Sequence, residues 1–273
     1  MRTRAPFLIT VPHSGLVVPD EVEGLMVLGA DDLARLADPA TGVLYDFGGR
    51  VAARLEARIS RMVVDVNRPP YHLPPLYPDG AVKSQTPDRR EVYRSGLPPI
   101  ELVHRLMMRH YFPFHEAIDR LLDENGIRCA FDCHSMEPIG PPRAKDAGRH
   151  RPLVCLGNHG DPNGEPHRGR LVSCPPAWLR NLATHFRERF PEGEVAINHP
   201  FPGGFTSMAH YWHRGIPWVA VELNRGLYEG LDGAIDTGAV EDLTERCWDA
   251  LAGFWEEVED TARFVRSPPA REK

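Results

Sequence analysis

Short runs of consecutive apolar residues recur along the chain and predict buried strands. Proline, glycine or charged residues bound each run, as expected where a strand enters and leaves a core. Parallel strands that are covered on both faces have this continuous apolar pattern instead of an alternating one. The predicted strands span residues 7–11, 61–66, 127–132, 153–156, 195–198 and 218–223.

Segments with apolar residues three and four positions apart separate these runs and predict helices. In the strongest of them, 99–124, one apolar stripe runs along the segment, and Pro113 is expected to kink the helix. The other predicted helices span residues 31–37, 44–58, 178–189 and 240–264. Residues 71–99 are dense in proline, aspartate and arginine, and loops of this length are often functional. Residues 266–273 are expected to fray.

Strands that alternate with helices predict an α/β layer fold with a largely parallel sheet. Because no linker or repeat divides the chain, we expect a single domain over residues 1–273. In such sheets, ligands bind beyond the carboxyl ends of the strands. The polar residues at 12–15, 67–68, 132–135 and 222–225 are therefore candidates for a functional site.

Composition narrows the class of partner. The 273 residues carry a formal net charge of −6, which argues against nucleic acid or an anionic membrane as the main partner. No apolar stretch is long enough to span a membrane, and the N-terminus lacks a signal-peptide pattern, so we expect a cytoplasmic protein. The five cysteines are irregularly spaced, which disfavours a disulfide framework and a cysteine zinc site.

Two histidines occupy matching positions in the sequence. His13 and His134 each follow an apolar run, and each precedes a serine. Neutral imidazole is a common zinc ligand, and a catalytic zinc usually takes three protein ligands and one water. The third ligand stays open between Asp38 and Asp46, although an aspartate before proline is more often a cap or turn residue. Asp132 could be a ligand or an acceptor that orients an imidazole.

Glu222 lies near the end of an apolar run, where a buried carboxylate is costly unless it is paired or functional. Near a metal it could act as a general base that takes a proton from water. An ion pair with Arg225 or another cation is the alternative interpretation.

Two arginines and a glycine pair are candidates for contacts with a substrate. Arg68 and Arg225 each follow an asparagine, and the guanidinium fork suits a carboxylate or a developing oxyanion. Arg61 is a further candidate, at the start of its predicted strand. Gly203 and Gly204 offer free backbone amides, although most glycine pairs are turns.

Seven short motifs follow one another along most of the chain. They are VPHSG from Val11, SRMVVDVNRPP from Ser60, VYRSGLPP from Val92, FPFHEAIDRLL from Phe112, FDCHSM from Phe131, NHPFPGG from Asn198 and VELNRGLY from Val221. In this order they resemble the N-formylglutamate amidohydrolase family. The resemblance implies a three-layer α/β/α fold with a mostly parallel mixed sheet, like that of the zinc carboxypeptidases and the aspartoacylase group.

The resemblance also implies an activity and a set of site residues. It implies a zinc-dependent amidohydrolase, with one Zn2+ per chain, that cleaves a small-molecule N-formyl or N-acyl amino acid into an acid and a free amino acid. Carried over by position, the expected metal ligands are His13, Asp38 and His134, and the expected catalytic residues are Glu222 as general base and Arg68. Asn67 and Arg68 are the substrate-binding residues that the resemblance implies. With the candidates Gly203, Gly204 and Arg225 from the preceding analysis, they make up the expected substrate-binding set.

Two other functions stay in view. A zinc carboxypeptidase or an amidase on a cell-wall-like peptide would be favoured if the loop 71–99 left an open groove. A non-catalytic small-molecule-binding relative is disfavoured, because His13, His134 and Glu222 are all present. The sequence leaves open a homo-oligomer and a divalent ion other than zinc.

Overall fold

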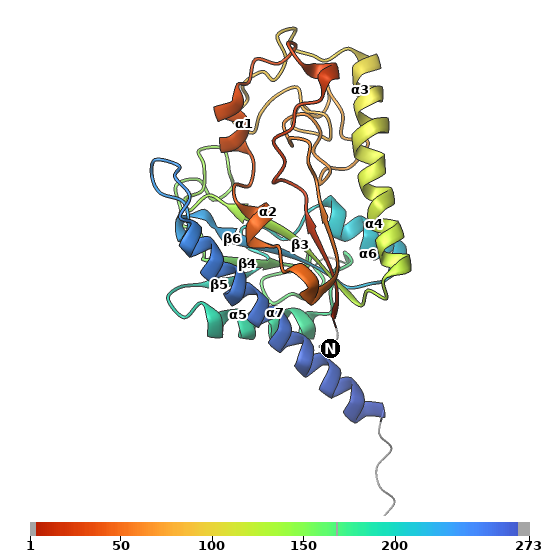
Figure 1. Ribbon diagram of the computed structural model, residues 1–273, viewed down its shortest axis with the longest axis vertical. Helices are drawn as coiled ribbons and strands as arrows, with labels where there is room; N and C mark the ends of the chain where they lie inside the picture. Colours follow the sequence, from red (N-terminus) through yellow and green to blue (C-terminus); the bar gives the residue numbers. More distant parts are fainter. Residues whose placement is uncertain (1–3, 168, 267–273) are drawn as a thin grey trace, which may run out of the picture.

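A six-stranded mixed sheet forms the centre of the computed structural model, which describes residues 4–167 and 169–266 (Figure 1). The strand order is β2-β1-β3-β6-β4-β5. Neighbouring strands among the first four are parallel, whereas β4 runs antiparallel to β6 and parallel to β5. The strands are β1 (Ala5–Val11), β2 (Val51–Glu56), β3 (Cys129–Met136), β4 (Val154–Gly157), β5 (Val195–Ile197) and β6 (Trp218–Asn224). The expected mostly parallel mixed sheet is confirmed.

Helices cover both faces of this sheet and complete three layers (Figure 1). Phe7 and Ile9 of β1 point into a core shared with α5 (Pro176–Arg189) and α7 (Thr237–Arg266). Leu8, between them, points into a second core with α3 (Ile100–Leu106) and α4 (Phe112–Glu124). Because successive strand residues face opposite sides, one apolar run serves both cores.

The expected helix over residues 44–58 is wrong. Helix α2 (Thr41–Leu44) ends where that helix should begin, and residues 51–56 form strand β2, parallel to β1. Gly48 adopts a positive φ of 55°, and a 3₁₀ turn (Gly48–Arg50) leads into the strand. The glycine pair thus interrupts the helical pattern, and pairing with the buried edge of β1 decides in favour of a strand.

The expected strand over residues 61–66 is also wrong, although the segment is buried. Its backbone turns instead: the amides of Val63 and Val64 donate to the Ser60 carbonyl, and the Asn67 amide donates to the Asp65 carboxylate. A side-chain acceptor of this kind offers the backbone an alternative to a strand ladder. The turn directs Asp65 and Asn67 toward the centre of the molecule.

Two further elements differ from the expectation. Strand β3 continues to Met136, so His134 lies within the strand and not beyond it. Helix α6 (Phe205–Arg214) was not expected; it begins directly after Gly204, and its end is marked by Gly215 at a φ of 69°. The other predicted strands and helices are confirmed within a few residues of their predicted ends.

Residues 71–99 contain neither helix nor strand, as expected, only isolated bridges and turns. The loop is anchored by buried side chains, among them Lys83 and Tyr93. The expected helix 99–124 is present and passes through a π-helical turn (Met107–Tyr111) just before Pro113. The remaining short elements are α1 (Ala30–Leu36) and the 3₁₀ turns Asp20–Val22 and Arg225–Leu227. Residues 267–273 of the expected fraying segment lie outside the described residues, and no described helix meets the length and hydropathy needed to cross a membrane.

Candidate active site

Three buried side chains from separate segments converge at the carboxyl end of the central strands. His13 follows β1, His134 lies in the adjacent strand β3, and Asp38 follows α1. The two Nδ1 atoms are 3.1 Å apart, and Asp38 Oδ2 lies 3.1 Å from His134 Nδ1 and 3.5 Å from His13 Nδ1. The Asp38 amide also donates to the His13 carbonyl at 2.9 Å, which ties the two segments together.

The outer nitrogen of each imidazole is bonded to its own carboxylate. His13 Nε2 lies 2.8 Å from Asp65 Oδ1, and His134 Nε2 lies 3.1 Å from Asp132 Oδ2. If each Nε2 donates its proton to that carboxylate, both Nδ1 atoms turn their lone pairs toward each other and toward Asp38. Such a set of acceptors is unfavourable unless a cation lies among them, and carboxylate-held imidazoles are the usual arrangement around a metal.

These three residues therefore fit a divalent cation with nitrogen and oxygen ligands, such as zinc. The other two candidates for the third ligand lie elsewhere. Asp46 is exposed and accepts from the Gly48 amide, and Asp132 accepts from Thr10 at 2.7 Å and faces the far side of His134.

Two arginines hold the Asp38 carboxylate. Arg225 Nη2 lies 3.3 Å and Arg61 Nη1 lies 3.5 Å from Asp38 Oδ1, which leaves Oδ2 turned toward the histidines. Burial by itself raises the pKa of Asp38, but the neighbouring His13 and His134 and the charge of Arg61 outweigh it and hold that pKa well below its usual range. Asp38 is thus kept ionised, as a metal ligand must be.

Glu222 is the residue of β6 that pairs in register with His134 of β3. Paired residues on neighbouring strands point to the same face of a sheet. The Glu222 carboxylate therefore lies on the same side of the sheet as His134, one of the three residues His13, Asp38 and His134 that are called the triad here. No hydrogen bond or ion pair joins the Glu222 carboxylate to another side chain in the described part of the chain, so the expected alternative, a pair with Arg225, is not formed. Burial raises the pKa of Glu222 to about 7, although the charge of His134 opposes the shift.

A cavity of about 490 Å³, called the arginine cavity here, opens onto Asp38. Its charged lining residues are Arg35, Arg61, Arg143, Arg151, Arg225, Asp38, Asp79, Asp88 and Glu137. Arg151 is bonded through two nitrogens to Asp146. By contrast, Arg143 is exposed, and no described side chain pairs with it. Arg35 makes only a long ion pair, with its Nη2 atom 3.8 Å from Asp88 Oδ2. The excess positive charge of this cavity therefore lies on its outer wall.

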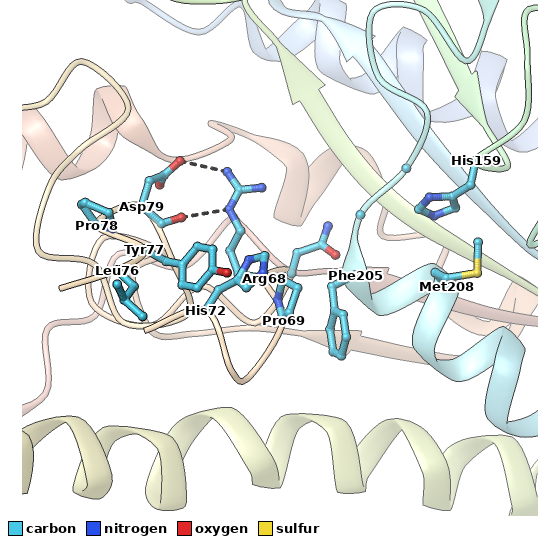
Figure 2. A pocket seen from close by; sticks show the side chains of 13 residues that line it. Arg68, Pro69, His72, Leu76, Tyr77, Pro78, Asp79, His159, Phe205 and Met208 are labelled. Atoms are coloured by element: carbon cyan, nitrogen blue, oxygen red, sulfur yellow. Dashed lines mark hydrogen bonds and ion pairs between the residues drawn. The ribbon is translucent and has the colours of Figure 1, made fainter. Parts of the chain in front are cut away.

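A second cavity of about 560 Å³, called the apolar cavity here, adjoins the first across Asp79, which lines both (Figure 2). Four of the expected substrate-binding residues lie along it: Asn67, Arg68, Gly203 and Gly204. Arg68 is bonded to Asp79, from Nη2 to Oδ2 at 3.1 Å and from Nε to the carbonyl at 3.2 Å (Figure 2).

Asn67 connects the apolar cavity with the triad. Its amide nitrogen lies 3.0 Å from both Asp132 Oδ2 and His134 Nε2, and its oxygen accepts from the Thr206 amide at 2.9 Å. A Cβ atom at Gly204 would lie 2.3 Å from the Asn67 amide, so only glycine fits against it.

Two residues of the site did not emerge from the sequence. Asp65 is fully buried and contacts His13, Arg61 and the Lys83 ammonium, which lies 3.0 Å from Asp65 Oδ2. Lys83 is also fully buried and bridges Asp65 to Asp79. An aspartate inside an apolar run was the one signal for Asp65; for Lys83, in a polar loop, the sequence carried none.

Comparisons with known proteins identify the family of the chain. The family model of N-formylglutamate amidohydrolase matches residues 5–229. The chain belongs to the N-formylglutamate amidohydrolase family. It is 33% identical to an N-formylglutamate deformylase of Pseudomonas aeruginosa over 196 residues, 66% of each chain, and 33% identical to that of Pseudomonas putida over 237 residues, 82% of each chain.

Solved structures of this kind share the fold. The crystal structure of an N-formylglutamate amidohydrolase from Ralstonia eutropha matches with a TM-score of 0.71 at 21% identity, over 92% of this chain and 95% of that one. A gene product of Agrobacterium tumefaciens matches with a TM-score of 0.63 at 20% identity, over 91% of each chain. The family expected from the seven motifs is confirmed.

Proposed function

We propose that the protein is a zinc-dependent amidohydrolase that removes the formyl group from an acidic N-formyl amino acid such as N-formylglutamate. The observation that carries the proposal is the convergence of His13 Nδ1, His134 Nδ1 and Asp38 Oδ2, which lie within 3.1 to 3.5 Å of one another. The names of the Pseudomonas relatives supply the substrate. His13, Asp38 and His134 would hold one zinc ion per chain, and a bound zinc would polarise the formyl carbonyl and make water more acidic.

Glu222 serves as the general base in this proposal. With its pKa raised by burial to about 7, the carboxylate is near half ionisation at neutral pH, so it can both accept a proton and return it. It takes a proton from the attacking water and then delivers that proton to the departing amine. The products are formate and the free amino acid.

The arginines have different tasks in this proposal. Arg225 and Arg61 keep Asp38 ionised and oriented, while Arg143 and Arg35 on the outer wall of the arginine cavity bind the substrate carboxylates. Arginine suits this task because its planar fork pairs with both carboxylate oxygens.

The remaining expected residues surround the acyl side of the substrate. Arg68 keeps Nη1 without a described hydrogen-bond partner and donates it to the developing oxyanion. Asn67 donates to Asp132, the carboxylate that holds His134, and Gly203 and Gly204 let the backbone approach the substrate.

The test combines metal content with hydrolysis in the wild-type protein and in Glu222→Gln. We expect about one zinc per chain in both proteins and a loss of about 100- to 10,000-fold in kcat for N-formylglutamate in the variant. Gln keeps the size of the side chain but cannot accept the proton. If Glu222→Gln still hydrolyses N-formylglutamate at the wild-type rate, Glu222 is not the general base. If the wild-type protein binds no zinc, the proposed zinc dependence is wrong.

A further inference from the structure

We propose that the apolar cavity is an acyl subsite, which gives the enzyme activity on N-acyl amino acids whose acyl chain is longer than formyl. The inference rests on the proposed function, because it takes the amide bond to lie at the triad and the amino-acid half in the arginine cavity. The same hydrolysis is involved: the amide C–N bond breaks, the acyl carbon gains hydroxyl from water, and the amine gains the proton.

The lining of the cavity is the first observation. Apolar and aromatic side chains of the segment 69–78 and of α6 line it, namely Pro69, Leu76, Tyr77, Pro78, Phe205 and Met208 (Figure 2). A formyl group places only a hydrogen atom beyond its carbonyl carbon and leaves about 560 Å³ unfilled. An alkyl chain would fill this volume and would gain from leaving water.

Charge separates the two cavities. In the apolar cavity, the guanidinium of Arg68 is paired with Asp79, which also binds the buried Lys83 ammonium. Burial lowers the pKa of His159, whose ring is bonded to Ser207 Oγ at 3.0 Å, so this histidine adds no charge at neutral pH. No described lining residue offers an uncompensated cation there, whereas Arg143 does so in the arginine cavity. The anionic half of a substrate is therefore directed to the arginine cavity and the acyl half to the apolar one.

Position is the third observation. Asp79 lines both cavities, Phe201 lines the arginine cavity, and Gly203 and Gly204 line the apolar one. The segment 201–204 therefore passes between them, and Asn67 of the apolar cavity lies 3.0 Å from His134 Nε2, on the side of the ring turned away from Asp38. In this inference the amide lies beside Asp38, which lines the arginine cavity, and the acyl chain lies beyond Asp79 in the apolar cavity.

Chain length is the variable in the experiment. The kcat/KM of the zinc-loaded protein is measured for N-acetyl-, N-butyryl- and N-hexanoylglutamate, with N-formylglutamate as the reference for the proposed function. The three longer acyl groups differ little in carbonyl reactivity, so their ratio reports binding. Each buried methylene is worth up to about fourfold, and we expect kcat/KM to rise at least ~10-fold from acetyl to hexanoyl.

Variants locate the effect. Met208→Trp fills the cavity, and we expect it to lower the hexanoyl-to-acetyl ratio about 10-fold or more. Met108→Trp makes the same exchange at an exposed methionine outside the cavity and should leave the ratio unchanged. Leu76→Glu is a second variant at a side chain that is 83% exposed, so folding is not at stake, and it should lower the ratio as well. Titration of the Glu222→Gln protein with N-hexanoylglutamate checks binding without turnover.

The outcomes separate the two proposals. If N-formylglutamate is hydrolysed but kcat/KM falls from acetyl to hexanoyl, the acyl subsite is refuted and the proposed function stands. A higher kcat/KM for N-formylleucine than for N-formylglutamate, without tolerance of longer acyl groups, would assign the cavity to the amino-acid side chain and overturn the inference. No hydrolysis of N-formylglutamate would refute the proposed function, and this inference with it.

Discussion

Replacing Asp132 by asparagine tests whether the carboxylates behind the imidazoles serve the metal site. Asp132 Oδ2 lies 3.1 Å from His134 Nε2, and its Oδ1 accepts from Thr10 at 2.7 Å. Asn has the same shape and can still accept from the imidazole, so the exchange removes the charge and little else. A neutral partner makes His134 a weaker base and therefore a weaker ligand.

The magnitude follows from this single lost charge. Removal of such a partner lowers metal affinity by about 10- to 100-fold, which is roughly 1.4–2.7 kcal/mol. At a fixed excess of free zinc, the holoprotein loses the same free energy of unfolding, or roughly 3–10 °C in Tm for a chain of this size. His134 and Thr10 outweigh burial and lower the pKa of Asp132, so the ionised carboxylate also stabilises the apoprotein, and unfolding without zinc measures that loss separately.

The assay is competition for zinc with a chromophoric chelator, followed by thermal unfolding with and without zinc. Asp119→Asn is the matched control, because Asp119 pairs in the same way with His210 Nδ1, at 3.0 Å, but belongs to α4, outside the ligand set. Equal zinc affinity in Asp132→Asn and the wild type, or an equal loss in Asp119→Asn, would refute the reasoning.

Three further predictions concern pH, substrate charge and packing. Because Glu222 must be ionised to accept a proton, kcat/KM should fall as pH drops through the pKa of Glu222, which is about 7 and is lower when a cation is bound nearby. A pH–rate profile in which this fall occurs above pH 8 contradicts the prediction. Arg143→Gln should raise KM for N-formylglutamate about 10-fold and raise KM for N-formylleucine less, because N-formylleucine lacks the side-chain carboxylate. Arg149→Gln, on the same loop, is the control. Equal effects on both substrates would show that Arg143 does not bind the side-chain carboxylate. Gly204→Ala should lower the free energy of unfolding by about 1–3 kcal/mol in urea titrations, because a Cβ atom overlaps the neighbouring asparagine amide, whereas Gly49→Ala meets no atom within 4 Å and should change little.

Several features of the site follow from local patterns in the chain. The apolar runs that became β1 and β6 predict buried parallel strands, since a strand covered on both faces has no polar side. Polar residues at the ends of such runs must lie where the strands leave the core. His13, His134 and Glu222 therefore stood out as candidates, and the ordered motifs carried the family.

Local patterns misled where tertiary contacts outweigh them. Residues 51–56 have helical spacing but pair with β1, because edge pairing and burial exceed a weak helical preference. Residues 61–66 are as apolar as a strand, yet Asp65 satisfies the backbone of its own turn. Burial was predicted correctly in that segment, and the backbone conformation was not.

The sequence by itself determined the α/β layers, the two candidate histidines and the carboxylate of Glu222, and the family resemblance named Asp38. Only the tertiary structure showed that Asp38, and not Asp46 or Asp132, faces both imidazoles, and that Asp65 orients His13. Asp38 and His134 are 96 positions apart in the chain, and His13 and Asp65 are 52 apart. Periodicity reports which residues are buried over a few neighbouring positions; which buried groups meet across such separations depends on how the layers pack, and no local pattern contains that.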